Sequence, residues 1–125
     1  MSEIEYFYSA HSAFAYLGSR RFIEVAAAAG RKIIHKPYYL NRGIAGVGSV
    51  PTRERPQNHR AYYFRREIDR WSEHREMPVM NGYPTHHWAD MTLANCMLIA
   101  ATREGANVNA LAHAMLQGHW RDDAD

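Results

Sequence analysis

The order of strand-like and helix-like segments most restricts the fold of this chain. Residues 4–8 (IEYFY) are β-branched and aromatic and predict a strand, and residues 33–40 predict a second one. Between them, residues 13–29 have a helical pattern that stops at Gly30. A strand, a helix and a strand in close succession predict a right-handed βαβ unit, which places the chain in the α/β class.

No further strand can be identified after residue 40, so the predicted sheet is short. Residues 41–57 predict a glycine-rich loop, and helices are predicted over 58–76, over 86–103 and from Asn107 onward. Two strands alone do not make a stable open sheet, because three or more with a covered face are normally needed. We therefore expect that strands are missing from this chain or come from a partner.

Apolar periodicity predicts one buried face for each helix. The residues expected to face the core are Phe22, Val25, Ala26 and Ala29, then Ala61, Phe64, Ile68 and Trp71, then Leu93, Met97 and Ala100, and finally Leu111, Ala112, Met115 and Leu116. Cys96 lies in an apolar run and is expected to be a buried thiol, which fits a reducing cytoplasm.

Length and composition limit the classes of function. With 125 residues, 46% of them hydrophobic, the chain has the size of one globular domain. A formal net charge of +2 is too small to indicate a nucleic-acid partner. The N-terminus shows no signal-peptide pattern, and no run approaches the roughly 20 apolar residues of a membrane span. We expect a cytoplasmic protein that binds neither nucleic acid nor membranes.

Ser12 lies where the first strand meets the first helix, and its hydroxyl has two interpretations. As an N-cap it accepts an N–H from the first helical turn and contributes about 1 kcal/mol. At the same position, a hydroxyl helped by the helix dipole can donate to a bound thiolate and favour its charged form. The residue pattern alone favours the cap. A serine hydrolase is disfavoured, because no acidic residue nearby orients His11 and no G-x-S-x-G motif is present.

Eight histidines raise the question of a metal site. His86 and His87 are adjacent, and His113 and His119 are six residues apart. Neither spacing matches the i, i+4 pairs that ligate zinc from one helix. We therefore expect surface histidines and no metal site.

Three segments together resemble a known family. EYFYSAHSAFAYLGSRRF, GSVPTRERPQNHRAYYFRREIDRW and LQGHWRDDAD resemble, in the right order, segments of the 2-hydroxychromene-2-carboxylate isomerases and the related kappa-class glutathione transferases. The residues that match are Ser12, Phe14, Tyr16 and Leu17 in the first segment, and Gly48, Pro51, Pro56, Tyr63, Glu67 and Trp71 in the second. The family belongs to the DsbA-like branch of the thioredoxin fold.

The resemblance implies one thioredoxin-like (DsbA-like) domain over residues 1–125. Residues 1–45 would form the N-terminal βαβ half, and 46–125 a loop and an inserted helical subdomain. The family binds glutathione, and the resemblance assigns Ser12 to stabilise its thiolate as the catalytic residue. Ser49 and Arg60 fall at glutathione-contacting positions, and His11 and Phe14 at positions expected to touch an aromatic substrate. In the isomerases the thiolate adds to a conjugated aromatic-degradation intermediate and leaves after bond rotation.

The chain departs from the family pattern in four ways. His11 replaces the usual apolar or aromatic residue. Ala13 replaces a proline and Ser49 replaces an asparagine, so the helix entry is less rigid and an amide is lost. The sequence also stops before the C-terminal ββα half, which in the family completes the glutathione site. Three interpretations stay open: a glutathione-dependent isomerase, a kappa-type transferase, or a truncated and inactive thioredoxin-like binding module. An unpaired strand edge also favours marginal stability or self-association, for example as a homodimer.

Overall fold

The computed structural model describes residues 2–125 and contains the predicted βαβ unit. Strand β1 (Glu3–Tyr8) is followed by helix α1 (Ala13–Ala28) and strand β2 (Lys32–Pro37). The two strands are parallel, with Tyr6 opposite His35. Gly30 turns the chain out of α1 at φ 62°, where a residue with a Cβ would be strained. β2 ends at Pro37, earlier than predicted. The Tyr38 N–H still donates to the Tyr8 carbonyl at 2.9 Å, but the Tyr38 carbonyl accepts from the Asn95 side chain instead of from the first strand.

The rest of the described chain is helical and connecting segments. It comprises α2 (Leu40–Gly46), a 3₁₀ turn (Thr52–Glu54), a π-helical segment (His59–Phe64), α3 (Arg65–Arg75), α4 (Thr92–Arg103) and α5 (Val108–Trp120). The prediction of a pure loop over 41–57 is wrong, since α2 and the 3₁₀ turn lie there. The predicted helix over 86–103 begins only at Thr92, where the Asp90 carboxylate accepts the Thr92 N–H at 2.7 Å.

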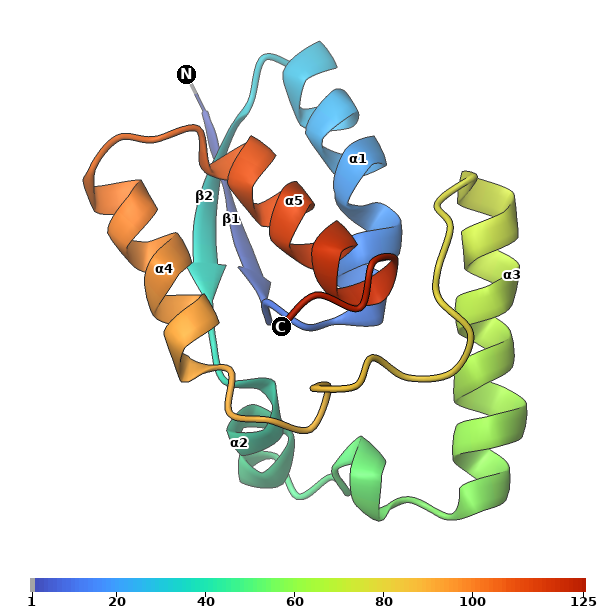
Figure 1. Ribbon diagram of the computed structural model, residues 1–125. Helices are drawn as coiled ribbons and strands as arrows, with labels where there is room; N and C mark the ends of the chain where they lie inside the picture. Colours follow the sequence, from blue (N-terminus) through green and yellow to red (C-terminus); the bar gives the residue numbers. More distant parts are fainter. Residues whose placement is uncertain (1) are drawn as a thin grey trace.

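The helices pack around the small sheet and around α1. α4 packs against β2, while α5 and α3 both pack against α1 (Figure 1). The core contains Tyr16, Leu17, Ile68, Leu98, Leu116 and Trp120. Among residues 2–125 each strand has a single hydrogen-bonded neighbour, so each has one edge that no described strand pairs. The predicted homodimer stays a prediction. So does the predicted division of the domain into a βαβ half (residues 1–45) and a helical insertion (residues 46–125).

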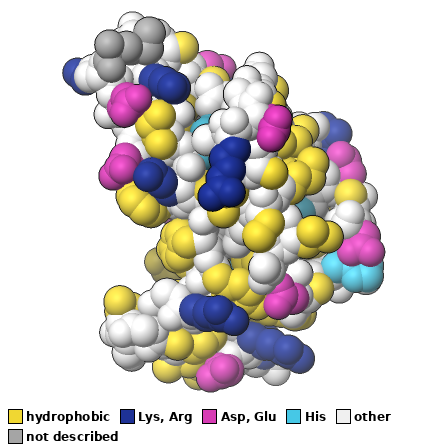
Figure 2. All heavy atoms as spheres, turned by 90° about the vertical axis from the view of Figure 1, so that its left-hand side faces the viewer, with side chains coloured by type: hydrophobic (Ala, Val, Ile, Leu, Met, Phe, Trp, Pro, Cys, Tyr) yellow, Lys and Arg dark blue, Asp and Glu magenta, His cyan; other side chains and the backbone are white. Residues whose placement is uncertain are grey.

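Helix α4 turns a different face inward from the one predicted. Leu98 is fully buried and Asn95 nearly so, whereas Leu93 is 83% and Met97 50% exposed. Cys96 is exposed, so the expected buried thiol is wrong. α4 is apolar on two sides, so periodicity alone cannot tell which side packs against β2. The side of the molecule that carries α4 shows many hydrophobic side chains among the charged ones (Figure 2).

Other predicted core positions are also more exposed than expected. Ala26, Ile68, Ala112 and Leu116 are buried as predicted, and Phe22, Phe64, Leu111 and Met115 are half-buried. Val25, Ala29, Ala61, Trp71 and Ala100 are exposed. The exposed Trp71 ring lies 5.3 Å from the Arg75 guanidinium, one turn further along α3, in a cation–π contact.

Buried Asn95 joins α4 to the ends of both strands. Its side-chain oxygen accepts the Ala10 N–H, and its NH₂ donates to the Tyr38 carbonyl, each at 3.2 Å. These two backbone groups lie just after β1 and β2, where no ladder bond serves them. Asn95 therefore fixes the segment that leads from β1 into Ser12.

We expect Asn95→Ala to lower the free energy of unfolding by about 2–3 kcal/mol, because it leaves two backbone groups without their partner. Urea unfolding followed by circular dichroism measures the change. Cys96→Ser, at the next and exposed position, serves as the control and should shift stability by less than about 0.5 kcal/mol. Equal effects of the two substitutions would show that the hydrogen bonds of Asn95 to Ala10 and Tyr38 do not stabilise the fold.

No helix among residues 2–125 is long and apolar enough to cross a membrane.

Candidate functional site

Ser12 caps α1 and keeps a free hydrogen for a further partner. Its backbone is extended (φ −69°, ψ 124°), and its Oγ accepts the Ala15 N–H at 3.2 Å. The predicted N-cap is therefore confirmed. The hydroxyl hydrogen finds no acceptor within residues 2–125, and the side chain is half-buried rather than sealed. The cap and the donor interpretations of Ser12 are thus compatible.

The turn that presents Ser12 is held rigidly from three sides. The Ser9 hydroxyl donates to the Met91 sulfur at 2.8 Å, and the Ala10 N–H is held by α4. The Trp120 indole N–H at the end of α5 donates to the His11 carbonyl at 2.7 Å. Since these groups are buried, the position of Ser12 at the start of α1 is set by the core.

A second group of polar atoms lies around Arg60. The Nε of Arg60, the Nδ1 of His59 and the hydroxyl of Tyr83 are buried and have no hydrogen-bond partner in the described chain. Burial raises the pKa of Tyr83, and the nearby charge of Arg60 opposes that rise. Buried donors without acceptors are rare in folded proteins, so Arg60 has an unused capacity to bind an anionic oxygen.

A row of aromatic rings connects the helix of Ser12 to this Arg60 region. The Phe14 ring meets the Phe64 ring edge-on at 5.6 Å, and Phe64 stacks with Tyr83 at 6.2 Å. Phe14 is 44% exposed, so the row has a surface that an aromatic molecule can reach. No side-chain contact of Ser49 with Ser12 or Arg60 is found in residues 2–125. Ser49 lies exposed after α2.

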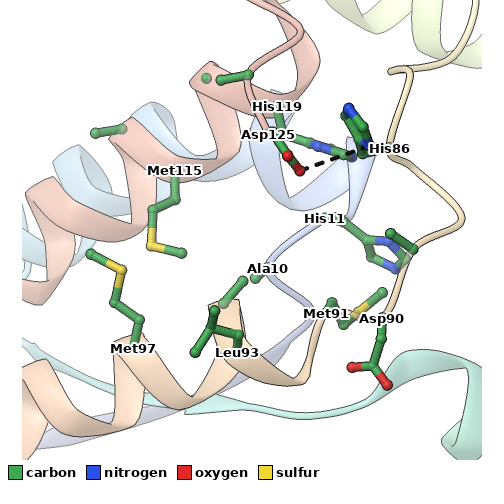
Figure 3. A pocket seen from close by; sticks show the side chains of 15 residues that line it. Ala10, His11, His86, Asp90, Met91, Leu93, Met97, Met115, His119 and Asp125 are labelled. Atoms are coloured by element: carbon green, nitrogen blue, oxygen red, sulfur yellow. Dashed lines mark ion pairs between the residues drawn. The ribbon is translucent and has the colours of Figure 1, made fainter.

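A cavity of about 550 Å³ opens beside the same turn, between α4 and α5. His11 and His86 line one side of it and the methionines Met97 and Met115 the other (Figure 3). Of the predicted site residues, His11 lines this cavity, whereas Ser12, Phe14, Ser49 and Arg60 do not. The structure therefore divides the predicted residues between a surface around Ser12 and Arg60 and a cavity behind His11.

The prediction that the histidines lie at the surface is wrong for part of the set. His11, His35 and His87 are buried. His11 and His87 form a cluster with half-buried His119, in which one ring nitrogen of each residue lies within 4.8 Å of the others. Sequence spacing could not detect this cluster, since its members come from three segments up to 108 positions apart. The i, i+4 criterion tests only ligands on a single helix.

Burial also controls the protonation of these rings. Burial is the main cause that lowers the pKa of His11 to about 4, against the opposing hydrogen bond to the His87 carbonyl, and the pKa of His87 to about 3. The neighbouring histidines act in the same direction as burial on both rings. The pKa of His119 is lowered by burial as well, with Asp123 opposing the shift. The cluster is consequently neutral near pH 7.

Comparison with known proteins supports the fold and the family. Residues 3–125 match the family model described as the DSBA-like thioredoxin domain. The chain belongs to this family. A solved structure of 2-hydroxychromene-2-carboxylate isomerase, in its selenomethionine form, is similar over 98% of this chain with a TM-score of 0.79 and 18% sequence identity. The similarity covers 58% of that solved chain, and no curated protein matches the sequence.

These findings confirm the predicted DsbA-like fold. An identity of 18% is evidence of fold and not of reaction. The role of each predicted site residue stays a prediction. The contacts around Ser12 and Arg60 are the structural observations on which a proposal can be based.

Proposed function

We propose that this chain carries the thiolate-activating part of a glutathione-dependent isomerase that acts on a conjugated aromatic-degradation intermediate. The observation that carries the proposal is the geometry of Ser12: its Oγ caps α1 while its hydroxyl hydrogen stays free. Membership of the DSBA-like thioredoxin domain family agrees with this placement, because the thiol chemistry of that fold occurs where the first strand enters the first helix. The reaction type comes from the resemblance of the sequence to the isomerases.

The residues present are suited to glutathione at two points. The α1 N-terminus and the free Ser12 hydrogen favour a negatively charged sulfur. The unpartnered Nε of Arg60 favours a carboxylate, of which glutathione has two. The aromatic row of Phe14, Phe64 and Tyr83 lies between these points and provides an apolar surface. Ser49 has no contact that supports a role in this site.

Each residue then has a defined task. Glutathione, when bound, supplies a thiol that is nucleophilic as its thiolate. The Ser12 hydroxyl donates to the sulfur and lowers its pKa, and the first N–H groups of α1 add positive potential. Arg60 orients the molecule through a carboxylate, and Phe14 covers the substrate ring. No residue in this set serves as a redox cysteine, because the single cysteine, Cys96, lies on α4.

We expect Ser12→Gly to raise the pKa of bound glutathione, seen as lost thiolate absorbance near the ultraviolet edge. Glycine is an acceptable N-cap and costs α1 only a few tenths of a kcal/mol, so the fold is retained. Difference spectra of protein with glutathione, recorded across pH, measure the pKa.

Ser12→Thr keeps a hydroxyl at the same position and serves as the matched control, with the thiolate band retained. An identical thiolate band in wild type and Ser12→Gly would reduce Ser12 to a helix cap and contradict the proposed function. Circular dichroism verifies that each variant is folded.

A further inference from the structure

Three histidines from separate segments meet beside the cavity. His11 follows β1, His87 lies in the turn before α4, and His119 lies in the last turn of α5. The His87 Nδ1 and His119 Nε2 atoms are hydrogen-bonded at 3.1 Å, so one of them carries a hydrogen that a cation would replace. Two imidazole nitrogens that ligate one tetrahedral zinc are about 3.3 Å apart, given bonds of about 2.0–2.1 Å. This pair thus has the separation of two ligands on one cation.

The His11 ring is oriented as a third ligand. Its Nδ1 lies 3.2 Å from the His87 carbonyl oxygen, so Nδ1 carries the hydrogen and donates. Its Nε2 then holds the free lone pair. An imidazole that donates one N–H to a backbone carbonyl while the other nitrogen binds metal is the usual arrangement in metal sites. The three candidate ligand atoms lie within 4.8 Å of one another, so a tetrahedral site requires the widest separation to shorten by up to roughly 1.5 Å.

Aromatic side chains fix the ring of His87. Trp88 meets it edge-on at 4.6 Å and Trp120 at 5.0 Å, while His11 stacks on it at 4.8 Å. Such a ring loses little further side-chain freedom when it binds a cation.

We propose that His11, His87 and His119 bind one divalent transition-metal cation of the zinc type. His11 and His119 line the cavity, so a fourth coordination position would face it and admit water or a ligand. Three imidazoles select zinc, cobalt, nickel or copper over magnesium and calcium, which prefer oxygen ligands. The prediction of no metal site rested only on spacing along single helices. The site does not depend on glutathione, so it can be tested apart from the proposed function.

Cobalt(II) titration of the chelator-treated chain tests this site. We expect one equivalent to bind with the intense visible bands of four-coordinate cobalt, and zinc to displace it and raise the melting temperature. His119→Ala should weaken binding more than tenfold, because it removes one of three ligands. His74→Ala, on the exposed side of α3, removes a histidine outside the cluster and should leave cobalt binding unchanged.

Three results would overturn the proposal. A spectrum that contains only the weak bands of six-coordinate cobalt would indicate binding at the surface. Equal cobalt affinities of His119→Ala and His74→Ala would exclude His119 as a ligand. A measurement on the unmodified chain covers the case in which His119→Ala does not fold. Histidine NMR signals should then show three imidazoles shifting together on addition of zinc, and shifts confined to other histidines would also refute the site.

Discussion

Trp120→Ala is expected to lower the free energy of unfolding by about 3–5 kcal/mol, the usual cost of removing a buried tryptophan. Trp120 is fully buried at the end of α5, and its indole N–H donates to the His11 carbonyl. A small domain has only about 5–15 kcal/mol of stability, so much of this variant would be unfolded if the chain lies at the low end. Urea unfolding at neutral pH gives the value.

Trp120→Phe separates packing from hydrogen bonding. It retains an aromatic ring but not the N–H, so we expect a smaller loss of about 1–3 kcal/mol, because the His11 carbonyl loses its donor. A loss below about 1 kcal/mol for Trp120→Ala would show that α5 does not hold the turn before Ser12. In that event the account of how Ser12 is positioned would fail.

The second large effect is a loss of stability in mild acid. His11 and His87 have pKa values near 4 and 3 in the folded chain, against about 6.5 when unfolded. Between these values the unfolded state binds more protons, so stability falls as the pH falls. Above about pH 6.5 the stability that comes from the lowered pKa values of His11 and His87 is fully present. We expect a loss of about 2–4 kcal/mol between pH 7.5 and pH 5.

Other titratable groups around the histidine cluster also contribute to the dependence of stability on pH. His119 and Tyr83 face the rings, and Asp90, Asp123 and Asp125 lie at or near the cavity. The unfolding experiment therefore includes His87→Leu, which removes one buried imidazole and should flatten the pH dependence. A chelator keeps the chain metal-free. Unchanged wild-type stability between pH 7.5 and 5 would contradict the buried, neutral state of His11 and His87.

Local sequence signals predicted the framework well. The βαβ unit, the Ser12 cap and the positive-φ Gly30 at the end of α1 all follow from short-range chemistry. Each of these features is decided by a few neighbouring residues, so one sequence suffices. The DsbA-like family was predicted differently, from the resemblance of three segments in the right order to a known family.

Long-range packing decided what the sequence could not show. The inward face of α4 depends on β2, because α4 has apolar residues on two sides. Asn95 reads as an ordinary helical residue until Ala10 and Tyr38 are placed beside it. The histidine cluster likewise exists only once α5 brings His119 to His87. None of these contacts leaves a periodic pattern along the chain.

Isothermal titration of the folded chain with glutathione tests the central claim most directly. The account predicts saturable heat for one site, with weaker binding of S-methylglutathione, which has no thiolate for Ser12 to hold. Arg60→Leu should weaken both ligands, since it removes the partner of a carboxylate. A chain that is folded by circular dichroism and gives no heat with glutathione would contradict the account.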